Sequence, residues 1–167
     1  MQWPGSDATE TAMKRTPALD ILARCNVPHQ VREFTATEFT AEEAADKLNL
    51  PLNLCFKTLL VQGERRGLAF ALVPGDAQLS LRKLARAMGD KRVELTDADD
   101  LFRLTGYLKG GCSPLGARRN FPVYMDQSAM QYERISVSAG LRGVQMLIAP
   151  ADLQRLTRAI LADIRED

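Results

Sequence analysis

The stretch CFKTLLVQ at Cys55–Gln62 decides the fold, together with LAFALV at Leu68–Val73. Both stretches consist largely of apolar residues, and the sequence between them, GERRG, is polar and begins and ends in glycine. Two strand-like runs joined by a short polar segment of this kind are typical of a β-hairpin. We therefore predict a hairpin here.

Lys57 interrupts the first of these strands. Alternation along a strand places it on one face with Leu59 and Val61, while Phe56 and Thr58 lie on the other face. Its ammonium could simply reach water beyond the strand, as long cationic side chains often do. It could also act as a fixed cation that contacts an ester, ribose or phosphate in a cleft. The sequence leaves both interpretations open.

Capping residues and periodicity predict the other elements. Helices are expected to begin at Thr16-Pro17, at a Thr40-Glu43 capping box, at Leu81, near Thr96 and at Pro150. Further strands are expected at residues 30–34, 123–125, 134–137 and 144–148, with a turn at Ser138-Ala139-Gly140. The last helix is expected to carry Leu153, Leu156, Ile160 and Ile164 on one side. This order predicts an α+β fold with a mixed or largely antiparallel sheet.

Length and composition predict one soluble domain. The chain has 167 residues, 46% of them hydrophobic, and a net charge of +1. Residues 1–15 lack periodicity and are expected to form a flexible tail before a single domain at 16–167. No apolar run approaches the roughly 18 residues that span a bilayer, and no signal peptide is visible. We therefore expect a cytoplasmic protein that does not contact membranes.

The cysteines and the single histidine limit the chemistry. Cys25, Cys55 and Cys112 are far apart in sequence and form no CxxC motif, a pattern typical of free thiols in a reducing compartment. His29 is the only histidine, so neither a zinc site nor a Ser-His-Asp triad is expected. We expect no metal and no cofactor.

The glycine-rich stretch TGYLKGGCSPLG at Thr105–Gly116 is the candidate site. It holds four of the eleven glycines. The segment Gly110–Pro114 is predicted to leave successive N–H groups unpaired and facing a concavity, a nest that binds anions or a developing oxyanion. The alternative is a tight loop between two elements. Tyr107 is either a wall of the pocket or part of the core.

Cys112 lies inside this loop but is not expected to be a nucleophile. Thiolate chemistry requires a lowered pKa, which normally comes from a nearby base or cation. The only histidine lies about eighty residues upstream. The remaining groups, a lysine and a backbone nest, suit a site that orients a reactive substrate and polarises its carbonyl.

Four motifs resemble one family. KTLLV at 57–61, TGY at 105–107, GGCSPLG at 110–116 and VSAGLRG at 137–143 are similar to the YbaK family of aminoacyl-tRNA deacylases, relatives of the editing domain of bacterial prolyl-tRNA synthetases. The resemblance runs from Thr16 to about Ile164. It implies a compact α+β domain with a mixed, barrel-like sheet flanked by helices. It also implies hydrolysis of mischarged tRNA, with cysteinyl-tRNA(Pro) as the substrate of the YbaK branch. The implied partners are the 3′ end of tRNA(Pro) and, as a candidate, prolyl-tRNA synthetase.

The same resemblance assigns the site residues. The family lysine corresponds to Lys57, the loop whose amides meet the aminoacyl group to Gly110–Pro114, and the pocket serine to Ser138. The expected catalytic residues are Lys57, Gly110 and Gly111. The expected substrate-binding residues are Phe34, Thr58, Tyr107, Cys112, Ser113, Pro114, Ser138 and Arg142.

No residue near the loop is an obvious nucleophile, so we expect the thiol of tRNA-linked cysteine to assist by attacking its own ester. Two departures from the family leave the aminoacyl group open: Phe34 stands where the branch often has tyrosine, and Gln145 where it often has aspartate. A deacylase for another small group, such as alanine, is one alternative. Another is a module that binds aminoacyl-tRNA or a synthetase without turnover. The basic residues Lys83, Arg86, Lys91 and Arg92 suit each of these functions, and they also suit a solvated helix face.

Overall fold

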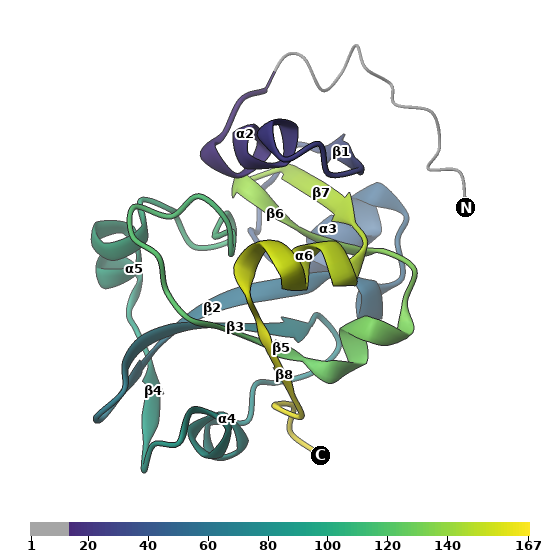
Figure 1. Cartoon of the computed structure of the whole chain (residues 1–167). Helices are drawn as coiled ribbons and strands as arrows, with labels where there is room; N and C mark the ends of the chain where they lie inside the picture. Colours follow the sequence, from purple (N-terminus) through teal and green to yellow (C-terminus); the bar gives the residue numbers. More distant parts are fainter. Residues whose placement is uncertain (1–13) are drawn as a thin grey trace.

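The computed structural model describes residues 14–167, which form two β-sheets with helices around them (Figure 1). The strands are β1 (His29–Glu33), β2 (Phe56–Gly63), β3 (Gly67–Pro74), β4 (Val93–Leu95), β5 (Val123–Asp126), β6 (Ile135–Leu141), β7 (Val144–Ile148) and β8 (Ile160–Ala162). The α-helices are α2 (Pro17–Arg24), α3 (Ala41–Leu48), α4 (Leu81–Met88), α5 (Ala98–Thr105) and α6 (Pro150–Thr157). Short 3₁₀ turns cover Leu52–Leu54 and Gln127–Gln131. The tail expected at 1–15 lies outside the described residues, except for Lys14 and Arg15.

The predicted hairpin is the centre of the larger sheet. β2 and β3 pair antiparallel from Phe56↔Pro74 to Gly63↔Gly67. β4 joins β2 antiparallel, whereas β5 pairs parallel with β3 and β8 pairs parallel with β5. The strand order is β4-β2-β3-β5-β8, so the expected α+β class with a mixed sheet is confirmed.

The smaller sheet has the order β1-β7-β6 and packs against the larger one. The two sheets meet at an isolated parallel bridge between Cys55 and Ser136. The structure therefore has two sheets joined at one point, where the resemblance implied a single barrel-like sheet. In the larger sheet, β4 pairs only with residues 61–63 of β2, so the first half of β2 keeps an open edge.

Two apolar cores lie on opposite faces of the larger sheet. Phe56 and Leu60 face the smaller sheet, whereas Val61 packs with Leu84 and Ala85 of α4. Figure 1 shows α4 on one side of β2 and β3, and β6 and β7 on the other. The predicted alternation is therefore confirmed, and Lys57 belongs to the face that α4 covers.

Side-chain caps begin the helices where the sequence predicted. The Thr16 hydroxyl accepts a hydrogen bond from Leu19 N at 3.0 Å, and the Thr40 hydroxyl accepts one from Glu43 N at 3.1 Å. Asp97, rather than Thr96, caps α5 by accepting from Asp100 N. No helix among residues 14–167 is long and apolar enough to cross a bilayer.

The predictions for the last 35 residues were partly wrong. Residues 138–140 were expected to be a turn but belong to β6, and the chain turns instead at Arg142-Gly143. The last helix ends at Thr157 because Arg158 adopts a left-handed conformation with φ of 57°. The next residues form β8, which pairs with β5, and the Asp126 carboxylate accepts a hydrogen bond from Ile164 N. Tertiary pairing therefore overrides the helical spacing of Ile160 and Ile164.

Replacing these two isoleucines separately tests the corrected chain end. Ile164 is fully buried, and Ile164→Ala should lower the free energy of unfolding by about 2–5 kcal/mol. Ile160 is 51% exposed, and Ile160→Ala should lower it by less than about 1 kcal/mol. Urea denaturation measures both values. A continuous helix would put both side chains on one face, so equal losses would contradict the strand.

Candidate functional site

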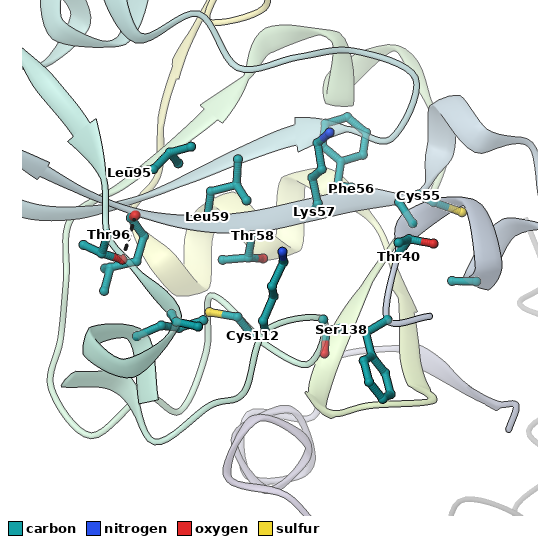
Figure 2. A pocket seen from close by; sticks show the side chains of 18 of the residues that line it. Thr40, Cys55, Phe56, Lys57, Thr58, Leu59, Leu95, Thr96, Cys112 and Ser138 are labelled. Atoms are coloured by element: carbon teal, nitrogen blue, oxygen red, sulfur yellow. Dashed lines mark hydrogen bonds between the residues drawn. The ribbon is translucent and has the colours of Figure 1, made fainter. Parts of the chain in front are cut away.

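A cavity of about 520 Å³ lies along the open edge of β2 (Figure 2). One wall is β2 itself, and a second is the start of α3 with the residue before its cap, Phe39. The segment from Leu95 to Ala98 closes one end. The loop after α5 contributes Gly110 and Cys112, while β6 and β7 contribute Ser138 and Gln145. The pocket thus gathers segments that are far apart in the sequence.

Thr58 gives the open edge its polar character. Leu60 O accepts a hydrogen bond from Thr96 N, so the N–H and C=O groups of Leu60 point away from β3. Backbone groups alternate in direction along an antiparallel strand, and Thr58, two residues earlier, therefore directs its N–H and C=O the same way. Thr58 Oγ1 is also the one buried side-chain oxygen or nitrogen without a hydrogen-bond partner in the described part of the chain. A buried hydroxyl left unpaired costs about 1–3 kcal/mol.

Lys57 lines the same pocket from the other face of β2. Figure 2 shows its side chain leaving the strand away from Thr58, which points toward Cys112 and Ser138. Lys57 is half-buried, and its ammonium makes no hydrogen bond or ion pair within residues 14–167. The lysine is therefore a free cation on the α4 side of the pocket.

Tyr107, Ser113 and Pro114 do not line the pocket, and the first two hold the loop together by hydrogen bonds. The Tyr107 hydroxyl donates to Leu115 O at 2.5 Å, and Ser113 Oγ accepts from Leu115 N. Burial, with a smaller contribution from Cys112, raises the pKa of Tyr107 to about 12, so its hydroxyl stays a neutral donor. Of the two alternatives for Tyr107, the structure supports a place in the core.

The two adjacent glycines have different roles. Gly110 lines the pocket with φ of 85°, and a Cβ there would lie 2.5 Å from the Cβ of Phe39. The N–H of Gly111, however, donates to Leu108 O at 2.9 Å, and a Cβ on Gly111 would lie 3.0 Å from Arg142 N. The expectation that the Gly111 amide faces the substrate is therefore wrong, because a turn within the loop uses this N–H. The N–H groups of Gly110 and Cys112 make no hydrogen bond within residues 14–167.

Cys112 lies in the pocket wall with its thiol protonated. Burial raises its pKa to about 12, and burial raises the pKa of Cys55, another wall residue, to about 11. Neither thiol is ionised at neutral pH, whereas nucleophilic cysteines have a lowered pKa. This agrees with the expectation that Cys112 is not a nucleophile.

Phe39 is a pocket residue that sequence reasoning missed. It precedes the cap of α3, where an apolar side chain often packs back onto its own helix. Here the Arg142 guanidinium lies 3.7 Å from the centre of its ring, and Arg142 Nε donates to Lys109 O at 2.8 Å. Arg142 thus joins two loops behind the pocket wall. Phe34 does not line the pocket, and its ring instead lies 6.0 Å from Lys47 Nζ.

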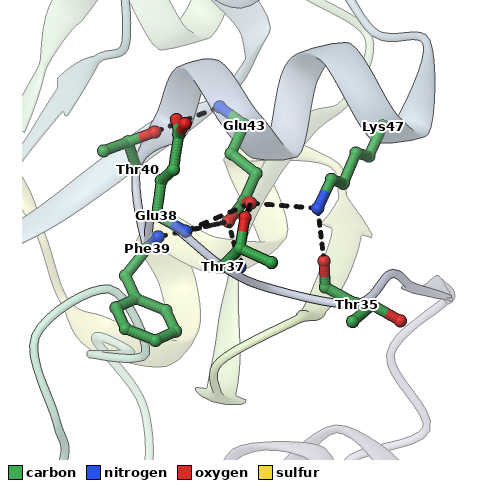
Figure 3. A network of polar contacts seen from close by, with 7 residues as sticks. All are labelled: Thr35, Thr37, Glu38, Phe39, Thr40, Glu43 and Lys47. Carbon is green, nitrogen blue, oxygen red and sulfur yellow. Dashed lines mark hydrogen bonds and ion pairs between the residues drawn. The ribbon is translucent and has the colours of Figure 1, made fainter.

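Glu43 fixes the segment that carries Phe39 (Figure 3). Its carboxylate accepts hydrogen bonds from the backbone N–H groups of Thr37, Glu38 and Phe39, and also pairs with Lys47. The hydrogen bond from the Thr37 side chain, helped by the others, holds the pKa of Glu43 well below its usual range. The predicted capping box therefore forms only in part: Thr40 caps the helix, but Glu43 reaches beyond Thr40 to the preceding loop.

Ser138 and Gln145 supply neutral polar groups opposite Thr58. They are paired residues of β6 and β7, and each is 7% exposed. Ser138 Oγ accepts from Gly140 N, and Gln145 Oε1 accepts from the Ser136 hydroxyl at 3.0 Å. No three His, Cys, Asp or Glu side chains among residues 14–167 gather as metal ligands do.

Comparison with known proteins identifies relatives of the whole domain. The aminoacyl-tRNA editing domain family matches residues 35–156. An Enterococcus faecalis protein named "Putative Cys-tRNA(Pro)/Cys-tRNA(Cys) deacylase EbsC" is 39% identical over 159 residues, which are 94% of this chain and 97% of that protein. Part of the proline–tRNA ligase of Thermosipho africanus is 34% identical over 84 residues, 50% of this chain and 15% of the ligase.

Solved structures agree with these matches. A structure described as "a putative trans-editing enzyme for prolyl tRNA synthetase" superposes with a TM-score of 0.80 at 27% identity, covering 92% of this chain and all of the other. The structure of a protein called APE2540 superposes with a TM-score of 0.84 at 24% identity, covering 90% of this chain, and shows the same fold.

Glu43→Gln tests the loop network through pH. A carboxylate whose pKa is lowered by folding stabilises the native state above its unfolded pKa, about 4.3, and this stability is lost as the pH falls through the folded pKa. The wild type should therefore be more stable than Glu43→Gln at pH 5–7, and the difference should shrink below about pH 4. Urea denaturation from pH 7 to pH 2.5 measures it. Asp46→Asn on the same helix is the exposed control, and a wild-type advantage that persists unchanged at pH 2.5 would contradict the network.

Proposed function

The chain belongs to the aminoacyl-tRNA editing domain family, and we propose that it deacylates mischarged tRNA in the cytoplasm, with cysteinyl-tRNA(Pro) as its preferred substrate. The family match spans most of the domain and agrees with the motifs found in the sequence. The relative from Enterococcus faecalis, 39% identical, is named for the same class of substrate. The choice of cysteine and of tRNA(Pro) is the specific part of the proposal.

One observation carries this proposal: four polar groups of the residues that line the pocket lack partners. Thr58 Oγ1, the Lys57 ammonium and the N–H groups of Gly110 and Cys112 make no hydrogen bond or ion pair with residues 14–167. Buried polar groups in proteins are nearly always paired. The buried Thr58 hydroxyl is unpaired on a cavity of about 520 Å³, so the site is suited to a polar ligand, which the half-buried Lys57 and the exposed Gly110 could also contact.

The two sides of the pocket suit the two ends of an aminoacyl ester. Thr58, Cys112 and Ser138 lie on one side of β2 (Figure 2), and we assign the aminoacyl group to this side, with the amides of Gly110 and Cys112 as its donors. Donors of this kind stabilise a developing oxyanion by roughly 3 kcal/mol each in other enzymes. Lys57 lies on the other side, and we assign it to the ribose or phosphate of the terminal adenosine. Gly111 supports the loop rather than the substrate.

The substrate itself supplies the nucleophile in this proposal. The thiol of tRNA-linked cysteine loses its proton to solvent while its sulfur attacks the ester carbonyl carbon. The bond from that carbon to the ribose oxygen then breaks, and the ribose oxygen takes up a proton. Water later opens the thiolactone ring and releases cysteine. Well-oriented intramolecular attack gains an effective concentration of about 10⁵ M or more. The pocket then needs only to fold the substrate and stabilise the oxyanion.

Thr58→Val separates a binding role from a structural one. Valine keeps the shape of threonine but removes the unpaired hydroxyl, so the free energy of unfolding should stay the same or rise. The kcat/KM for cysteinyl-tRNA should nevertheless fall by about tenfold to a hundredfold. Lys57→Met, which keeps the apolar stem, should also lower kcat/KM without unfolding the protein. Unchanged turnover in both variants would remove this pocket from the reaction.

A substrate series tests the thiol mechanism. Seryl- and alanyl-tRNA(Pro) are close in size to cysteinyl-tRNA(Pro) but lack the thiol, so they should be deacylated at least about a hundredfold more slowly in single-turnover assays. Cys112→Ala should retain most activity on cysteinyl-tRNA, because the reacting sulfur belongs to the substrate. Comparable rates on all three substrates would rule out thiol assistance and indicate an activated water.

A further inference from the structure

A second, basic groove lies between α4 and the segment that leads into β4. It encloses about 470 Å³. The charged residues that line it are four cations and one carboxylate: Arg82, Arg86, Lys91, Arg92 and Asp90. The whole chain carries a net charge of only +1, so positive charge is concentrated here. A local excess of this kind attracts polyanions.

The cations of this groove are not used to stabilise the fold. All four are exposed, and none forms an ion pair within residues 14–167. Arg82 and Arg86 are four residues apart on α4, where like charges destabilise a helix. Lys83 on the same helix differs, because its ammonium pairs with Asp163 and Asp167 at 3.0 and 2.7 Å.

The Asp90 carboxylate is bonded to backbone N–H groups and forms no ion pair with the cations of the groove. Its carboxylate accepts hydrogen bonds from the backbone N–H groups of Arg65, Arg66 and Lys91. These bonds, led by the one from Arg66, lower the pKa of Asp90 and fix the β2–β3 turn beside the groove. The guanidinium groups of Arg86 and Arg92 therefore remain available to an external anion.

The groove and the pocket both border β4. Val93 lines the groove and Leu95 lines the pocket, two residues or about 7 Å apart along the strand. Stacked nucleotides advance about 3.4 Å each, so about two nucleotides bridge this distance. Leu95 is 54% exposed between the two sites and offers an apolar contact for a base. Lys57 leaves β2 on the face that α4 covers, which is the side of the groove.

We propose that this groove binds the phosphate backbone of the acceptor end of tRNA, so that the 3′ strand runs past Leu95 into the pocket. The inference rests on the proposed function and deepens it by assigning the surface that holds the RNA. Arginine suits phosphate because its planar fork donates two parallel hydrogen bonds. Phosphate contacts carry no sequence information. The groove therefore supplies affinity for tRNA in general, and the pocket supplies selection of the aminoacyl group.

Salt dependence of binding tests the groove directly. Fluorescence anisotropy with uncharged, 5′-labelled tRNA(Pro) between 50 and 300 mM KCl gives the slope of log K against log salt. The double variant Arg86→Ala/Arg92→Ala should make this slope shallower by about 1.4–1.8, since each phosphate contact contributes about 0.7–0.9. Lys83→Ala is the matched control, because Lys83 is ion-paired, and it should leave the slope unchanged. A wild-type slope in the double variant would overturn the proposal.

Steady-state kinetics show whether the two arginines act on tRNA binding or on the reaction itself. The double variant should raise KM for cysteinyl-tRNA(Pro) about tenfold with kcat unchanged, and it should hydrolyse the short ester cysteinyl-adenosine as the wild type does. Equal losses on the two substrates would overturn the proposal, because the short ester cannot reach the groove. Binding by the wild type that is insensitive to salt would overturn it as well. Since anisotropy uses uncharged tRNA, it decides the groove even if the wild type hydrolyses neither ester.

Discussion

β4 pairs with β2 only through Val61–Gly63, and the pocket depends on this short overlap. A longer β4 would pair with Thr58 and close the edge that now borders the cavity. Instead the chain leaves β4 after Leu95, caps α5 with Asp97 and returns as the glycine loop on the far side of the cavity. An open strand edge is usually a liability for aggregation. Here α3, α5 and the loop cover it, so that its polar groups face an enclosed space.

Close backbone approaches hold the loops around this edge. Gly110 packs against Phe39, Gly111 against Arg142, and Gly143 against the carbonyl of Phe34. A Cβ at any of these glycines would come within 3.0 Å of its neighbour. The three contacts tie the segment before α3, the loop after α5 and the β6–β7 turn into one unit. Mobile loops alone would not hold donors in the positions that oxyanion stabilisation requires.

The distribution of charged residues fits the proposed function. Thr58, Ser138 and Gln145 line the pocket as neutral polar groups, Lys57 and Lys109 line it as cations, and the arginines lie in the groove beyond β4. An aminoacyl-tRNA has the matching order, with a neutral ester at its end and phosphates behind it. In the proposed function, a chain with a net charge of +1 would thus hold the phosphates in a cationic groove beside the pocket that takes the ester.

The sequence by itself determined the elements that depend on local interactions. Alternation predicted the β2–β3 hairpin, threonine caps predicted the starts of α2 and α3, and spaced glycine motifs predicted the family. Contacts between distant segments decided the rest. Ile160 and Ile164 have helical spacing, yet pairing with β5 makes a strand. Glu43 fits a capping box, yet the 37–39 loop supplies better donors. Whether a polar group is free depends on which neighbours fold against it, so only the tertiary structure showed that the Gly111 amide is bonded and that Thr58 Oγ1 is not.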